Sequence, residues 1–96
     1  MTKPPMFSFQ LYIAGDTVNS AQAVANLSAL CQAYLPKQHK IEIVDVFRES
    51  KRALKENILM TPTLIKLAPV PLGRIVGTLS QTNLVLQALG LGTSIP

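Results

Sequence analysis

The chain has 96 residues, 48% of them hydrophobic and only 15% charged, so it predicts one folded domain over residues 1–96 and excludes intrinsic disorder. No run approaches the roughly 18 apolar residues of a membrane span and no secretory segment opens the chain, so we expect a cytoplasmic protein with no membrane association. The net charge of +4 is carried by dispersed basic residues, with only three Phe and two Tyr for base stacking, which argues against nucleic acid as a partner.

The first half of the chain predicts a strand, a helix and a second strand. Residues 7–14 begin with alternating polarity and become apolar, as in an interior strand. Asn19 or Ser20 is predicted to cap a helix that ends before Pro36. Its apolar residues repeat at helical spacing, namely Val24, Leu27, Cys31 and Leu35. Residues 40–47 are rich in β-branched side chains, so the second strand should lie parallel to the first.

The second half predicts a helix, two strands and a last helix. Helix formers fill residues 50–59, and apolar strands follow around Leu64–Leu67 and Ile75–Leu79, joined by a connector rich in Pro and Gly. Ser80 is predicted to cap a helix over residues 81–89. The resulting order, β-α-β-α-β-β-α, is that of a thioredoxin-like domain. In such domains the third strand opens on a cis proline, which Pro62 would supply here. Residues 1–6 and 92–96 are expected to fray.

No constellation of residues predicts an active site, a cofactor or a metal centre. A thioredoxin-type reductase needs a Cys-x-x-Cys at the start of the first helix, and that segment contains no cysteine. Cys31 lies on the apolar stripe further along and is interpreted as an inert core thiol. His39 is expected in an exposed loop, and Asp45 near a strand end, bonded to the backbone. We therefore predict a protein that is not an enzyme.

Five blocks of sequence resemble the KaiB family of circadian-clock proteins. They are Leu11–Ser20 (LYIAGDTVNS), Glu42–Val46 (EIVDV), Ile58–Leu64 (ILMTPTL), Pro69–Pro71 and Arg74–Ser80 (RIVGTLS). The resemblance as a whole runs from about residue 9 to residue 91, and the LYxAG and TPTL blocks are the most specific. The resemblance implies a metamorphic protein whose first half, β-α-β, is shared by two folds. The resting form is implied to be a homotetramer or dimer of order β-α-β-β-α-α-β, and the switched form a monomer with the thioredoxin-like order.

The resemblance also implies the partners and the residues that meet them. The switched form would dock on a KaiC-like hexameric ATPase and, in a full clock, capture a KaiA-like protein. The implied partner-binding positions are Gln22, Arg48, Asn57 and Arg74. At Gln22 and Asn57 the family commonly has Arg and Lys, and it has a second Arg where Gly73 stands here. The alternative is a KaiB-type signalling or stress-response protein that acts with a sensor histidine kinase and has no circadian role.

Four positions are expected to govern the change of fold. Pro62, Pro69 and Pro71 concentrate slow conformational alternatives in one segment. Ala88 replaces a glycine that the family usually has. Ala is favoured over Gly inside a helix by roughly 1 kcal/mol, so this residue should favour the thioredoxin-like form.

Overall fold

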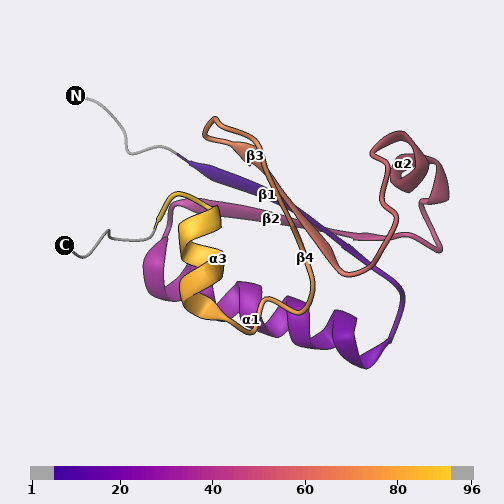
Figure 1. Ribbon diagram of the computed structural model, residues 1–96, viewed down its shortest axis with the longest axis horizontal. Helices are drawn as coiled ribbons and strands as arrows, with labels where there is room; N and C mark the ends of the chain where they lie inside the picture. The colour runs from indigo at the N-terminus through magenta and orange to yellow at the C-terminus, as the bar shows by residue number, and fades with distance from the viewer. Residues whose placement is uncertain (1–5, 92–96) are drawn as a thin grey trace.

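A four-stranded mixed sheet forms the centre of the molecule in the computed structural model, which describes residues 6–91 (Figure 1). The strands lie in the order β2-β1-β3-β4, with β2 parallel to β1, β3 antiparallel to β1, and β4 antiparallel to β3. The elements in chain order are β1 (Phe7–Ile13), α1 (Val18–Tyr34), β2 (His39–Asp45), α2 (Ser50–Lys55), β3 (Thr63–Ala68), β4 (Gly73–Val76) and α3 (Thr82–Ala88). The predicted thioredoxin-like order is confirmed.

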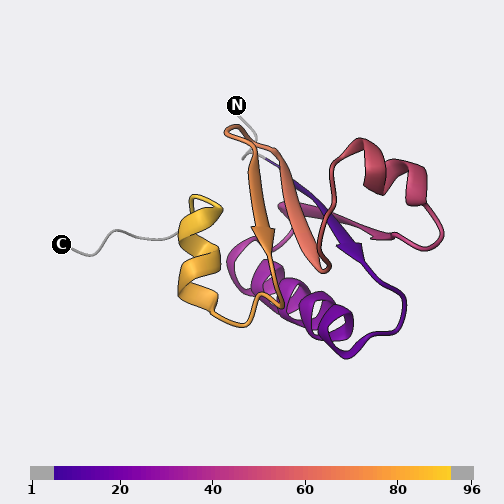
Figure 2. The same ribbon diagram turned by 45° about the vertical axis from the view of Figure 1, so that its right-hand side comes forward.

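Helices cover both faces of the sheet. Helices α1 and α3 pack on one face and the short α2 packs on the other (Figures 1 and 2). Strand β1 serves both layers, because successive side chains of a strand point to opposite faces. The core beneath α1 and α3 is the larger one, and its most buried members include Phe9, Leu11, Leu27, Cys31, Leu64 and Leu89. The core beneath α2 is small and consists of Tyr12, Val44 and Ile65, with Val46 and Ile58 packed against it.

Lys66 is a buried cation within the larger layer. Its side chain points from β3 towards α3, and the residue is only 3% exposed. Nζ donates a hydrogen bond to the carbonyl oxygen of Leu89 at 3.1 Å and lies 5.8 Å from the centroid of the Phe7 ring. Leu89 is the C-terminal cap of α3. The ammonium therefore meets the end of a helix whose carbonyls lack intrahelical partners and carry partial negative charge.

The first helix is capped by Thr17, so the prediction of Asn19 or Ser20 was wrong. Thr17 Oγ1 accepts a hydrogen bond from the Ser20 backbone N–H at 3.3 Å. The hydroxyl of Ser20 is turned inwards instead, where it accepts from the N–H of Ala14 at 3.0 Å. Ser20 is thereby buried and links the end of β1 to the first turn of α1.

The second half also departs from the predicted boundaries. Helix α2 ends at Lys55, well before residue 59, because Asn57 adopts a left-handed φ of 55° that a helix cannot continue through. Ser80 does not cap α3. Gln81 takes the cap position without a side-chain bond, and Ser80 Oγ instead accepts from Thr78 Oγ1 at 3.3 Å. Leu79 lies beyond β4, with a φ of 63°, and contributes to the core.

The sequence resemblance implies two folds, and the structure has the thioredoxin-like one. The peptide bond between Thr61 and Pro62 is cis and immediately precedes β3, as predicted. The bonds that precede Pro69 and Pro71 in the β3–β4 turn are cis as well. The resting arrangement stays a prediction. Within residues 6–91, no helix has both the length and the apolar character needed to cross a bilayer.

Candidate partner-docking surface

Exposed apolar side chains gather on and just after α2. Leu54 is 77% exposed, Leu59 91% and Met60 65%. Leu54 lies on α2 three residues after Lys51, at the spacing of neighbours on one side of a helix, while Ala53 points into the protein. Apolar groups placed together in water are typical of surfaces that bind another protein. We define the α2 surface as Arg48, Lys51, Leu54, Lys55, Leu59 and Met60.

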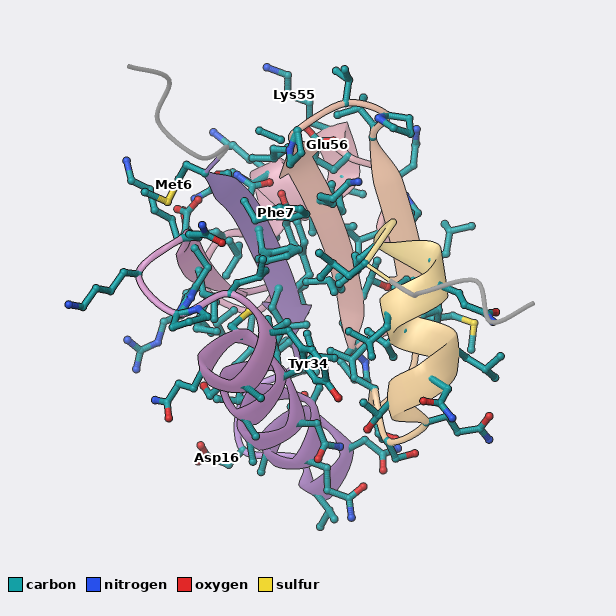
Figure 3. The ribbon with its side chains drawn as sticks, turned by 90° about the vertical axis from the view of Figure 1, so that its left-hand side faces the viewer. Met6, Phe7, Asp16, Tyr34, Lys55 and Glu56 are labelled. Carbon is teal, nitrogen blue, oxygen red and sulfur yellow. The ribbon has the colours of Figure 1, made fainter. Side chains whose placement is uncertain are left out.

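The α2 surface carries a net positive charge. Arg52 is occupied within the protein, since its guanidinium lies 2.8 Å from Glu42 and 3.1 Å from Glu49. The hydrogen bonds that Glu42 accepts from Arg52 and from Gln10 hold the pKa of its carboxyl below the ordinary value. Among residues 6–91, Arg48, Lys51 and Lys55 form no ion pair. Figure 3 shows Lys55 on the side of the sheet remote from the α1 residue Tyr34.

Arg74 ties strand β4 to the end of α2. Its Nη2 donates to the carbonyl of Glu56 at 2.8 Å and its Nη1 to that of Asn57 at 3.3 Å. These carbonyls lie just past the last turn of α2, where backbone acceptors lack helical partners. Arg74 and Asn57, two of the four predicted partner-binding residues, are thus brought together. The shape of the α2 surface therefore depends on the pairing of β4 with β3, which positions Arg74.

The other predicted residues lie in separate places. Arg48 is exposed ahead of α2 and belongs to the α2 surface. Gln22 is exposed on α1, which covers the opposite face of the sheet. Of the four positions expected to govern the change of fold, Pro62 is buried, Pro69 and Pro71 lie in the β3–β4 turn, and Ala88 is the exposed last residue of α3.

Cys31 is fully buried in the larger core, as predicted. Burial raises the pKa of its thiol to about 11, because the core does not solvate a thiolate. A thiol with this pKa is almost entirely protonated near neutral pH and is a poor nucleophile. The thiol therefore packs as a small apolar group.

The remaining titratable candidates bond to the backbone. His39 is half-buried at the start of β2, where Nδ1 lies 2.7 Å from the carbonyl of Leu35, so the prediction of an exposed loop residue was wrong. Asp45 ends β2, and its Oδ1 accepts from the N–H groups of Gly15 and Phe47, as predicted. Within residues 6–91 no three His, Cys, Asp or Glu side chains are grouped as metal ligands.

The sequence did not reveal the exposed apolar residues of the α2 surface. Leu54 and Ile58 are one helical turn apart in the sequence, a spacing that predicts a single apolar side of a helix. Only Ile58 packs on the core, because the helix ends before it and the chain turns at Asn57. Lys51, one helical turn before Leu54, is the sign in the sequence that this side of the helix faces water.

Comparisons with known proteins agree with this architecture. The KaiB domain family model matches residues 10–91. The circadian clock protein KaiB3 of Synechocystis is 48% identical over 82 residues, which are 85% of this chain and 80% of that protein. The circadian clock oscillator protein KaiB of Synechococcus elongatus is 34% identical over 91 residues, with 95% and 89% covered. Both relatives are named for a clock, and neither name states a reaction.

Solved structures show the same fold at lower identity. The N-terminal domain of Synechococcus elongatus SasA matches 100% of this chain and 94% of its own with a TM-score of 0.74, at 17% identity. Mitochondrial thioredoxin 3 of Saccharomyces cerevisiae matches 93% of this chain and 82% of its own with a TM-score of 0.71, at 21% identity. At such identities the likeness establishes the thioredoxin-like fold alone.

Proposed function

This chain belongs to the KaiB family, and we propose that it is a non-enzymatic regulatory protein that docks on a KaiC-type hexameric ATPase through the α2 surface. The KaiC-type partner follows from the family resemblance. The supporting observation in the structure is the exposure of Leu54, Leu59 and Met60 beside cations that have no acidic partner among the described residues.

The α2 surface has the composition of a protein interface. Its apolar side chains would supply the buried centre, and Arg48, Lys51 and Lys55 would form a charged rim. Such rim charges speed encounter with a surface of opposite charge. The ATPase should therefore present an acidic rim around an apolar depression. Arg74 and Asn57 would contribute by fixing the end of α2 rather than by direct contact alone.

Fold switching would regulate this docking. The α2 surface depends on the contact between Arg74 of β4 and the carbonyls after α2, and this contact exists in the thioredoxin-like form. In the resting form that the resemblance implies, the second half packs differently and the contact would be lost. The ATPase would then bind one form only and draw the population towards it.

Charge reversal on α2 tests the proposal. In the double variant Lys51→Glu/Lys55→Glu, we expect affinity for the co-encoded KaiC-type ATPase, measured by biolayer interferometry with and without nucleotide, to fall at least tenfold. The matched control is Lys37→Glu/Lys40→Glu, which makes the same charge change on two exposed residues, one before β2 and one at its start. Equal affinity in both double variants would refute docking through the α2 surface.

A second arm of the same experiment addresses the alternative partner. In this arm, a co-encoded sensor histidine kinase replaces the ATPase as the binding partner in the interferometry measurement. Binding to the kinase with no binding to the ATPase would favour the signalling or stress-response role and refute the KaiC-type partner. A KaiA-like protein, where one is encoded, should bind only when the ATPase is already present.

A further inference from the structure

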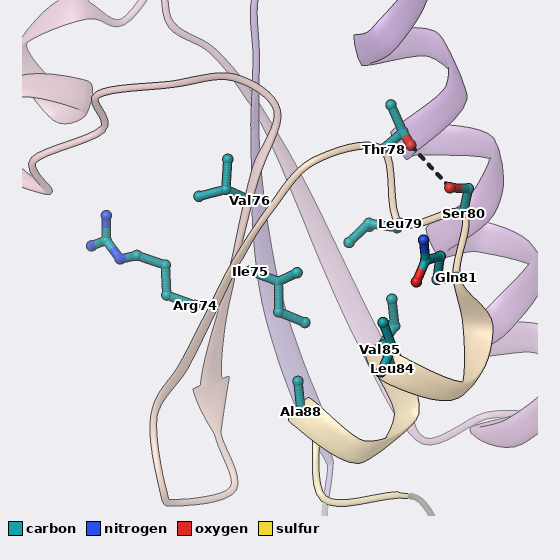
Figure 4. A pocket seen from close by; sticks show the side chains of 10 residues that line it. All are labelled: Arg74, Ile75, Val76, Thr78, Leu79, Ser80, Gln81, Leu84, Val85 and Ala88. Atoms are coloured by element: carbon teal, nitrogen blue, oxygen red, sulfur yellow. Dashed lines mark hydrogen bonds between the residues drawn. The ribbon is translucent and has the colours of Figure 1, made fainter.

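A groove runs between strand β4 and helix α3, away from the α2 surface (Figure 4). Its volume is about 570 Å³. Residues of β4, of α3 and of the segment between them line it, and Leu84 on α3 is 58% exposed. Ile75 and Ala88 face this groove from the two sides in Figure 4, whereas Arg74 points away to the other face of the sheet. We call it the β4–α3 groove.

Strand β4 borders the groove and is an edge strand with unpaired backbone. It pairs with β3 on one side, and no strand of residues 6–91 pairs with the other. The N–H of Gly77 donates to the carbonyl of Pro62, so residues 77 and 62 form a hydrogen-bonded pair. Such pairs alternate along an antiparallel ladder, which makes Ile75 the next residue bonded to β3. The N–H and C=O groups of Arg74 and Val76 therefore point to the open edge.

The side chains along this edge are apolar except for one cation. Val76 is 51% exposed on the same face as Arg74, and Leu84 and Ala88 are exposed on the helix above. Arg74 is the one charged residue of β4, and its side chain lies on the face of the sheet opposite the groove. Its hydrogen-bond partners are neutral carbonyls, and no carboxylate of residues 6–91 pairs with it.

We propose that the β4–α3 groove binds an extended segment of a partner protein, which adds to the sheet as a fifth strand beside β4. The backbone groups of Arg74 and Val76 would bond to the added strand. An acidic side chain of the segment would lie opposite Arg74, because opposite charges in directly facing cross-strand positions stabilise the pairing. The residues on either side of that acid would be apolar and would contact Ile75 and Leu84. This site is separate from the α2 surface and does not rest on docking to an ATPase.

Strand β4 of a second copy is a poorer occupant on grounds of charge. Strand β4 has the sequence Gly-Arg-Ile-Val and contains no acid. Antiparallel pairing of two β4 strands places Arg74 opposite either its own copy or Val76, since facing residues must share a face of the sheet. The first register brings like charges together and the second leaves both cations unpaired. An acidic, apolar segment satisfies Arg74, and a second β4 does not.

A synthetic peptide tests the proposal. The probe is acetyl-Ser-Val-Glu-Val-Thr-Val-Ser-amide, titrated into the ¹⁵N-labelled full chain and followed by two-dimensional amide NMR. We expect saturable shifts in residues 74–78 and 84–88, and in residues 56–58 because Arg74 bonds to the carbonyls of Glu56 and Asn57, with residues 51–55 unmoved. A peptide with Lys in place of Glu should bind at least threefold more weakly. Shifts spread over the whole chain, or equal binding of both peptides, would overturn the proposal.

A pair of variants at one position isolates the backbone bond. Val76→Pro removes the outward N–H, which an edge strand tolerates, whereas Val76→Ala shortens the side chain and keeps the N–H. We expect Val76→Pro to bind the peptide at least fivefold more weakly than Val76→Ala. If Val76→Pro unfolds, Leu84→Lys is used instead. It places a charge in the apolar groove at an exposed helix position and should weaken peptide binding. Binding unchanged in Leu84→Lys refutes the site. Shifts at β4 that follow protein concentration without peptide would identify a second copy as the occupant and also refute it.

Discussion

Replacing Lys66 with methionine should loosen the end of α3 without opening the sheet. Methionine has nearly the length of lysine and keeps the packing against Phe7, but it cannot donate to the Leu89 carbonyl, 3.1 Å from Nζ. A hydrogen bond from a charged group contributes about 1.5–3 kcal/mol. Each 1.4 kcal/mol is a factor of about ten in an equilibrium constant, so local opening of α3 should become at least tenfold more frequent.

Native-state hydrogen exchange measures this opening directly. Protection of the amides of Leu86 and Leu89 should fall at least tenfold. Protection of the β1 and β3 amides should change by less than about threefold. The global free energy of unfolding is a less direct measure, because it reports the whole core together with the end of α3. Lys40→Met is the matched control, since Lys40 is exposed on β2. If the α3 amides exchange no faster in Lys66→Met than in Lys40→Met, Lys66 does not hold the helix in place.

Four further predictions concern the thiol, the last helix and the assembly. Cys31→Ser should lower the free energy of unfolding by about 1–2 kcal/mol, because it buries a hydroxyl that has no hydrogen-bond partner in the core. Binding of the partner protein should stay intact, and its loss in a folded variant would contradict an inert thiol. Because the folded pKa of Cys31 is raised to about 11, its contribution to stability should be fully present below about pH 9 and lost as pH rises towards 11, a slope that urea titrations should find absent in Cys31→Ala. Ala88 proves to be the last residue of α3 rather than an interior one, so Ala88→Gly should disfavour the thioredoxin-like form by only a few tenths of a kcal/mol, a population change of about twofold in amide NMR spectra; equal populations in both proteins would remove the switching argument. The resting form should be a tetramer at high concentration, and light scattering that found only the 10.4 kDa monomer would refute it.

The order of elements could be predicted from sequence because each strand and helix has its own periodicity. The alternation at the start of β1 and the three- and four-residue spacing of α1 are local properties of the chain. The first helix cap could not be predicted in the same way. Thr17, Asn19 and Ser20 are all good capping residues, and Ser20 is excluded only because its hydroxyl bonds to the end of β1.

The candidate site was harder to predict than the fold. The pairing of Arg74 with the carbonyl of Asn57 joins residues 17 positions apart and depends on how β4 registers against β3. Lys66 occupies a strand position that composition alone would assign to a solvent-facing side chain. Its burial results from a tertiary contact, because the end of α3 lies above it. Local patterns predict elements, whereas sites arise where distant elements meet.

The β1–β3 ladder has a consequence for how the protein aggregates. It is the one strand pairing, within residues 6–91, that joins the first half of the chain to the second, and its register shifts between Ser8 and Phe9. Breaking that ladder would release residues 50–91 as a unit and leave β1, α1 and β2 as a smaller foldon. In that intermediate, β1 presents a bare edge of Phe9, Leu11 and Tyr12. An unpaired apolar strand edge can pair with strands of neighbouring molecules. Molecules that pass through this intermediate at high concentration should therefore exchange strands with one another.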